Sequence, residues 1–148
     1  MRLLVARALL MSHSLIFMPF RDGEPCSVPT QSVARILATH HFNDFELADG
    51  TNAIHTPLDT NGNATIGDHV SVNCDDGQVS EIAIDRPLYD TAYRRLAFDL
   101  LTHLNLAMMS SGGETLRTAP TMTNHVPDDV LSQFYDTDTD VQELDQLP

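Results

Sequence analysis

The sequence predicts an α+β fold, with a mostly antiparallel or mixed sheet of four to five short strands and two main helices packed on it. Three observations favour this class. Two alternating segments flank an Asp-Gly pair, which is a strong hairpin signal. One long segment carries an apolar stripe at helical spacing. Strands and helices also fail to alternate strictly, as they would in a parallel sheet, and the predicted order is β-α-β-β-β-α-β-α.

The N-terminal half predicts a strand, a helix and a second strand. The apolar run 14–20 is short, contains Ile and Phe and ends at turn-forming residues, which indicates a buried strand. A helix over about 31–41 follows, because apolar residues recur there at helical spacing. Segment 44–51 alternates and closes on Asp-Gly, so we expect a short strand there. The polar segment 51–68 is expected to be a loop.

The C-terminal half contains the clearest elements. Segment 69–85 predicts a hairpin of two alternating strands joined by an Asp-Gly turn. Segment 89–105 predicts an amphipathic helix, because its leucines and tyrosines share one face. A closing strand is expected over 106–111. A last short helix is expected over 126–135, where a proline and two aspartates suit a helix start.

The charge balance is the strongest global signal. The chain has 21 acidic residues against 8 basic ones, which gives a formal net charge of −13. Such a surface repels phosphate backbones and anionic membranes, so we expect neither a nucleic-acid nor a membrane partner. It attracts basic proteins and speeds their association. Solubility alone is the alternative explanation of this charge.

The chain length of 148 residues matches one ordinary domain. We expect residues 1–11 to be a dispensable N-terminal extension, with Met1 and Met11 as alternative start sites. Residues 12–135 are expected to form a single α+β domain. Residues 136–148 are rich in aspartate and are expected to form an acidic flexible tail.

Two features predict a cytoplasmic location. The apolar run over residues 1–20 is interrupted by Arg7, and no small-residue cleavage site follows it, which disfavours a signal peptide. Cys26 and Cys74 have no CxxC spacing, so we expect free thiols in a reducing compartment. A single bridge between these two cysteines remains the alternative.

One loop has the spacing of a metal site. Asp59, Asn61 and Asn63 stand at alternate positions, as the first three ligands of a calcium loop do. On these residues the segment resembles the calcium loop of EF-hand and dockerin proteins, which implies a weak calcium site. However, Ala64 replaces the turn glycine and Val70 replaces the bidentate glutamate. We therefore interpret the segment as a polar turn, in which Asn and Gly favour Asx turns and positive φ, and we expect no metal.

The seven histidines leave a catalytic hypothesis open. No HExxH motif and no nucleophile elbow is present, so the sequence contains no complete catalytic motif. The alternative function is a small enzyme or ligand-binding domain with a His/Asp-lined pocket between the sheet and a loop. The residues that would line it are His40, Asp68, His69 and His103.

The favoured hypothesis is a non-enzymatic acidic protein that binds a basic partner protein, as an inhibitor or an immunity-type protein would. It rests on the net charge and on the missing catalytic motifs. No cofactor is expected, and the oligomeric state is left open. The residues expected to contact the partner are the carboxylates of the hairpin turn, the last helix and the tail: Asp75, Asp76, Asp128, Asp129, Asp136, Asp138 and Asp140.

Overall fold

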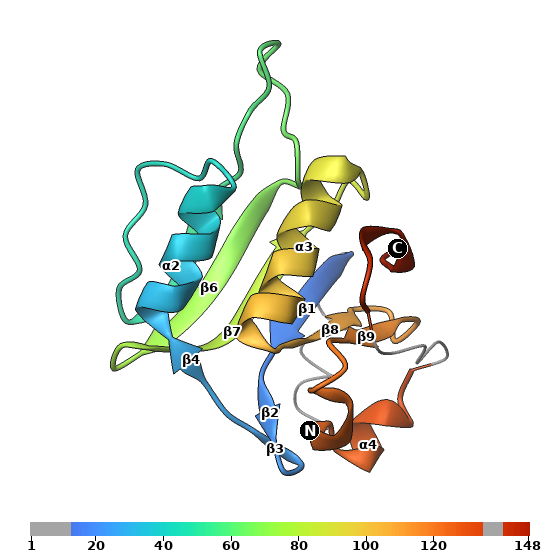
Figure 1. Cartoon of the computed structure of the whole chain (residues 1–148). Coiled ribbons are helices and arrows are strands. Elements are labelled where there is room, and N and C mark those ends of the chain that lie inside the picture. The colour runs from blue at the N-terminus through green and yellow to red at the C-terminus, as the bar shows by residue number, and fades with distance from the viewer. Residues whose placement is uncertain (1–12, 135–140) are drawn as a thin grey trace.

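The structure, a computed structural model, describes residues 13–134 and 141–148. Helices α2 (Thr30–Thr39) and α3 (Thr91–Leu104) lie side by side on one face of an antiparallel sheet (Figure 1). The predicted α+β class is therefore confirmed.

The main sheet has seven strands, more than the four to five that the sequence predicts. The strand order is β5-β6-β7-β1-β8-β9, β4 pairs with β7, and every pairing is antiparallel. The predicted number of strands is too low because β4 and β9 are too short to show the alternation of apolar and polar residues that marks a strand. The strands of this sheet are β1 (Ser14–Met18), β4 (Val28–Pro29), β5 (Gly50–His55), β6 (His69–Asp75), β7 (Gln78–Asp85), β8 (Ala107–Ser110) and β9 (Leu116–Thr118). Strands β2 (Phe20–Arg21) and β3 (Glu24–Pro25) form a separate small ribbon.

Strand β1 is apolar on both faces because it lies between two cores. It pairs with β7 on one side and β8 on the other, and all five of its residues are buried. Leu15 and Phe17 face the core under α2 and α3. Ile16 and Met18 face a second core on the opposite side of the sheet. A continuous apolar run is the pattern expected of a strand that is covered on both faces.

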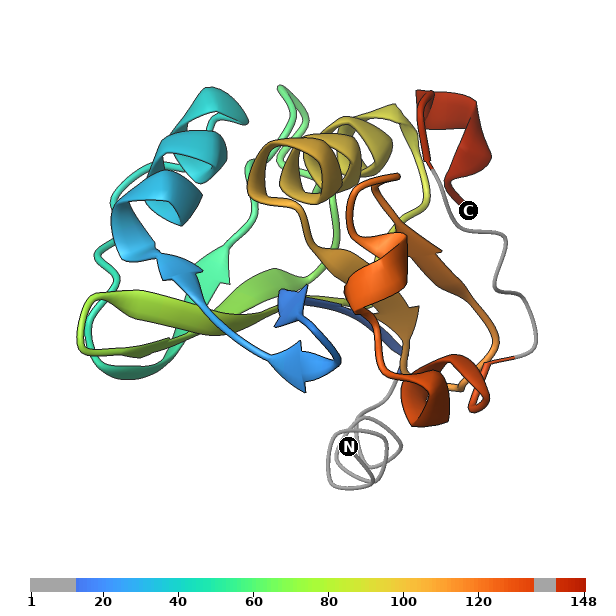
Figure 2. The same ribbon diagram turned by 60° about the horizontal axis from the view of Figure 1, so that its bottom comes forward.

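The segment after β9 forms the cover of the second core. It contains a 3₁₀ turn, η1 (Thr123–His125), and the short helix α4 (Asp128–Leu131). Met122, Val126 and Val130 are buried against β1 and β8. Figure 2 shows this segment beside the β8–β9 half of the sheet, while no described element covers the same face of β5 and β6.

The hairpin of β6 and β7 confirms the prediction over 69–85. Asp76 and Gly77 both have positive φ, at 52° and 74°, as the two central residues of a type I′ turn require. Inward-facing Val70 and Val72 are fully buried, while the alternate residues His69, Ser71 and Asn73 are only partly buried. Period-two patterning and turn chemistry thus specify the same register.

Helix α3 also follows its predicted pattern. Its buried residues are Tyr93, Leu96, Ala97, Leu100 and Leu101, which form one stripe against the sheet. The Asp90 carboxylate accepts a hydrogen bond from the Tyr93 backbone N–H at 3.2 Å and so caps the helix. Asn105 ends it in the left-handed conformation.

Removal of this cap gives a modest prediction. Asp90→Ala is expected to lower the free energy of unfolding by about 1 kcal/mol, because the first turn loses its acceptor. Asp90→Asn keeps an acceptor and should stay within a few tenths of the wild-type value. Urea denaturation of both variants measures the difference, and equal stabilities for the two would show that the cap contributes nothing.

The region 44–68 differs from its prediction. Residues 44–49 of the expected strand 44–51 form a loop. Strand β5 runs instead through Gly50–His55, mostly inside the segment expected to be a loop. Phe45 and Leu47 do alternate, but they pack as partly buried loop residues against the core under α2. In β5 only Ile54 is buried, so the strand carries almost no apolar pattern.

The end of the chain contacts the core through two residues of the described segment 141–148, which belongs to the expected tail 136–148. Val141 and Leu147 are buried in the core under α2 and α3, and the Val141 backbone N–H donates to the Thr118 carbonyl at 2.7 Å. A 3₁₀ turn, η2 (Leu144–Gln146), lies between these two anchors. The sequence does not indicate this anchoring, because the two apolar residues stand far apart in a polar segment. The aspartates of 136–140, like the extension 1–11, lie outside the described residues.

Candidate functional site

One half of the sheet carries a large share of the negative charge. The chain has no Lys or Arg between Arg35 and Arg86, and this stretch contains nine Asp and Glu residues. It folds into the loop 43–49 and into β5, β6 and β7, which are consecutive neighbours in the sheet. A compact part of the fold therefore combines many carboxylates with no Lys or Arg of its own.

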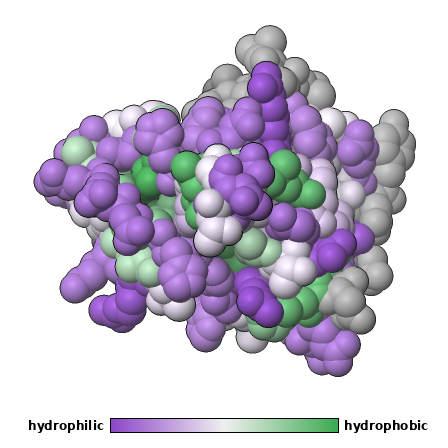
Figure 3. All heavy atoms as spheres, turned by 90° about the horizontal axis from the view of Figure 1, so that it is seen from above, coloured by the Kyte–Doolittle hydropathy of each residue, from purple (hydrophilic) through white to green (hydrophobic). Residues whose placement is uncertain are grey.

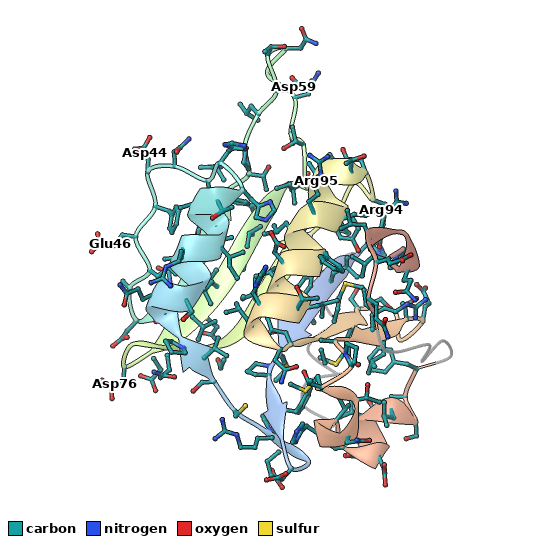
Figure 4. The ribbon with its side chains drawn as sticks, in the orientation of Figure 1. Asp44, Glu46, Asp59, Asp76, Arg94 and Arg95 are labelled. Atoms are coloured by element: carbon teal, nitrogen blue, oxygen red, sulfur yellow. The ribbon has the colours of Figure 1, made fainter. Side chains whose placement is uncertain are left out.

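Five exposed carboxylates of this half form what we call the acidic edge. Asp49 and Asp76 are held together, because the Asp76 backbone N–H donates to Asp49 Oδ1 at 3.0 Å. Figure 4 shows Asp44, Glu46 and Asp76 pointing outward along the same flank of the molecule. In the described part of the chain, no ion pair joins any of these carboxylates to an Arg or His. The acidic edge consists of Asp44, Glu46, Asp49, Asp75 and Asp76.

The structure separates the carboxylates that the sequence proposed as one binding set. Asp75 and Asp76 lie at the tip of the β6–β7 hairpin. Asp128 and Asp129 lie in the first turn of α4, at the other end of the sheet (Figures 1 and 2). The remaining three, Asp136, Asp138 and Asp140, lie outside the described residues. Of the described pairs, only the hairpin pair belongs to the acidic edge.

A second polar cluster lies between α2 and α3. His40, at the C-terminal end of α2, places Nε2 2.6 Å from Asp99 Oδ2. His103, one turn after Asp99, places Nε2 3.6 Å from Asp99 Oδ1. Asp99 and His103 border a cleft of about 330 Å³, and His40 borders another of about 410 Å³. The sequence could have indicated the contact between Asp99 and His103, because they are four residues apart on α3. The contact between Asp99 and His40 depends on how α2 packs against α3.

The other two residues of the catalytic alternative lie elsewhere. His69 Nε2 lies 2.5 Å from Asp85 Oδ2, and Ser14 Oγ donates to Asp85 Oδ1 at 2.8 Å. Asp68 forms an ion pair with Arg86 at 3.1 Å. The four residues His40, Asp68, His69 and His103 are thus divided between the helix side of the sheet and its far side.

The cluster around Asp85 has the wrong order for nucleophilic catalysis. An activated serine needs the imidazole between the hydroxyl and the carboxylate, so that the imidazole takes the proton. Here the carboxylate of Asp85 stands between Ser14 and His69. In addition, Ser14 is only 1% exposed and cannot be reached by a substrate. We interpret these contacts as structural, because they provide hydrogen-bond partners for buried polar groups.

The segment that resembles a calcium loop projects from the fold between β5 and β6 (Figure 1). Asp59 Oδ1 accepts backbone N–H groups from Asn61 and Asn63, at 2.8 and 2.9 Å. Gly62 adopts a positive φ of 81° at the tip. The carboxylate thus closes an Asx turn. Within the described residues, no group of three or more His, Cys, Asp or Glu side chains is arranged to hold a metal ion.

Both cysteines are free thiols in the structure. Burial raises the pKa of Cys74, and the nearby Asp49 carboxylate raises it further. Burial also raises the pKa of Cys26, although the Arg21 guanidinium opposes this. Both thiols therefore hold their protons more firmly than an exposed cysteine does, and neither has the lowered pKa of a reactive thiolate.

The thiols give a direct prediction. At pH 8 the native protein should react with a thiol reagent slowly, because raised pKa values reduce the thiolate fraction. Cys26 should react first, since it is partly exposed while Cys74 is buried. Peptide mapping of the alkylated protein measures the order. In urea, without reductant, both thiols should titrate at once, and a missing pair would reveal a disulfide instead.

The surface at the end of the molecule where the 57–65 loop projects is mainly hydrophilic, with apolar areas that are small and separate (Figure 3). Leu58, which is 65% exposed, belongs to this loop and lines the larger cleft beside His40. The two clefts are lined by polar and apolar side chains together, unlike the mainly apolar pockets that enclose small ligands.

Comparison with protein-family models, with curated proteins and with solved structures gave no match to this chain. Among the described residues, no helix has the length and apolar character needed to span a bilayer.

Proposed function

We propose that this protein is a non-enzymatic, acidic interaction protein that binds a basic partner protein. Its most concrete form is an inhibitor or immunity-type protein that covers a cationic surface of its target. In this proposal the protein acts in the cytoplasm, where Cys26 and Cys74 stay reduced.

One observation carries the proposal: the acidic edge gathers exposed carboxylates in a region with no Lys or Arg between Arg35 and Arg86. Unpaired carboxylates on neighbouring segments produce a local negative potential, which steers and orients a cationic partner. In a protein selected for solubility alone, both signs of charge are usually interspersed over the surface.

Affinity capture with a salt gradient tests the proposal. The immobilised full-length protein should retain a small number of basic proteins from a cell extract at low ionic strength. One of them should form a stoichiometric complex when purified, and raising the salt concentration should weaken that complex. Retention of only acidic proteins, or binding that salt leaves unchanged, would count against the proposal.

A control must exclude simple ion exchange, because any protein of charge −13 attracts cations. An unrelated soluble protein of similar size and net charge serves this purpose. Proteins held equally by both supports are nonspecific, and only those held selectively by this chain count as partners.

A second candidate function is ligand binding between α2 and α3. The observation that favours it is the His40–Asp99 contact of 2.6 Å beside the two clefts. A screen of small polar ligands by thermal shift tests it, together with elemental analysis for bound metals. Stabilisation that disappears in His40→Ala and His103→Ala would support this function, and no stabilising ligand or bound metal would reject it.

A further inference from the structure

Strand β5 forms one border of the main sheet and is left unpaired on its outer side. It pairs with β6 over Gly50–His55, and no backbone hydrogen bond joins it to any other segment in the described part of the chain. The opposite border is different. There the Val141 backbone N–H donates to the Thr118 carbonyl of β9 at 2.7 Å, so the end of the chain covers that strand.

Strand β5 also lacks the usual features that protect a sheet edge. Such edges commonly carry Lys, Pro or a bulge, which prevents another chain from pairing with them. Gly50–His55 contains no charged residue and no proline, and its register with β6 is unbroken. Four of its six residues are exposed. The strand is therefore suited to accept another strand.

The charges around β5 indicate the chemistry of the strand that would pair with it. Asp49 directly precedes β5, and Asp75 and Asp76 lie beside its start because Gly50 pairs with Cys74. Asp44 and Glu46 extend the same negative flank (Figure 4). A second copy of this chain would bring two such flanks together, whereas a basic segment would neutralise them.

We propose that β5 is the docking site for an extended basic segment of the partner, which adds to the sheet as a further strand. This inference rests on the proposed function and specifies its binding mode. Backbone hydrogen bonds to β5 would supply affinity, and Arg or Lys side chains of the added strand would contact the acidic edge.

The geometry also predicts a sequence pattern for the added strand. Side chains alternate between the two faces of a strand, so every second residue lies on the helix side of the sheet. The loop 43–49 packs on that side through Phe45 and Leu47, and its Asp44 and Glu46 point outward along the flank (Figure 4). On the other face the neighbours are Thr51, Ala53 and His55, which are all exposed and carry no carboxylate. The preferred segment therefore alternates basic residues with β-branched ones.

Hydrogen exchange with synthetic peptides tests the inference on the full chain. The probe is a peptide of about eight residues in which Arg and Val alternate, with both ends blocked. The first control is the same peptide with its four central backbone amides methylated, which keeps every charge but removes the donors. The second control replaces each Arg by Glu.

The expected result is slower exchange of amides within 50–55 when the Arg-Val peptide binds. Methylation should weaken binding by about tenfold or more, and the Glu-Val peptide should not bind. Equal binding of the methylated peptide, or protection only outside β5, would overturn strand addition but leave a charge-driven complex intact. No binding of the Arg-Val peptide would also overturn it, and partner capture would then decide the proposed function separately. Protection of the outward-facing amides of β5 without peptide, together with a dimer in solution, would assign the edge to a second copy and reject the inference.

Discussion

Phe17→Ala is expected to lower the free energy of unfolding by about 3–5 kcal/mol. Phe17 is fully buried at the centre of the sheet, where it pairs across strands with Ile82 on β7 and Met108 on β8. Removing its ring leaves a cavity that rigid neighbouring strands cannot close. Because domains of this size are usually stable by only about 5–15 kcal/mol, much of the native stability should be lost.

Chemical denaturation monitored by circular dichroism measures this change. Leu58→Ala is the matched control, because Leu58 is an apolar residue that is 65% exposed in the projecting loop. Its replacement should alter the free energy of unfolding by no more than about 0.5 kcal/mol. Similar effects of the two substitutions would contradict the position of β1 between two cores.

Neutralising the acidic edge is expected to have the largest effect on partner binding. Asp49 is kept, because its carboxylate holds the hairpin tip through the Asp76 backbone N–H. At low salt the association rate should fall by about tenfold or more, since steering depends on the local field of the binding surface. The edge variant combines Asp44→Asn, Glu46→Gln, Asp75→Asn and Asp76→Asn.

A second variant with the same change in net charge provides the control. Its four substitutions lie in the β2–β3 ribbon and at the start of α4, away from the acidic edge. This variant should retain most of the wild-type association rate, and equal losses in both variants would show that net charge alone drives binding. The control variant combines Asp22→Asn, Glu24→Gln, Asp128→Asn and Asp129→Asn.

The sequence predicted those parts of the fold that are specified by local pattern. The type I′ turn at Asp76 and Gly77 and the apolar stripe of α3 are examples, because each depends on residues close together in the chain. Strand β5 was not predicted, because it is an edge strand in which only Ile54 is buried. Edge strands of this kind take their conformation from the neighbouring strand more than from their own residues.

The candidate site was predictable only in part. The charge of the hairpin turn was visible in the sequence, and Asp75 and Asp76 belong to the acidic edge. Their proximity to Asp49 follows from the pairing of β5 with β6, which the sequence did not indicate. Likewise, the contact between His40 and Asp99 joins two helices far apart in the chain. Such contacts between distant segments depend on tertiary packing and leave no local pattern.

The most direct test of this account is the association rate of the wild-type protein with its captured basic partner, measured over a range of ionic strengths. The Debye length, which is the distance over which the charges of the acidic edge act, falls from about 30 Å at 0.01 M salt to about 8 Å at 0.15 M. We predict that the association rate falls steeply over this range while the dissociation rate changes little. An association rate that does not depend on salt would contradict the central claim, which is that exposed carboxylates beside β5 attract and orient the partner.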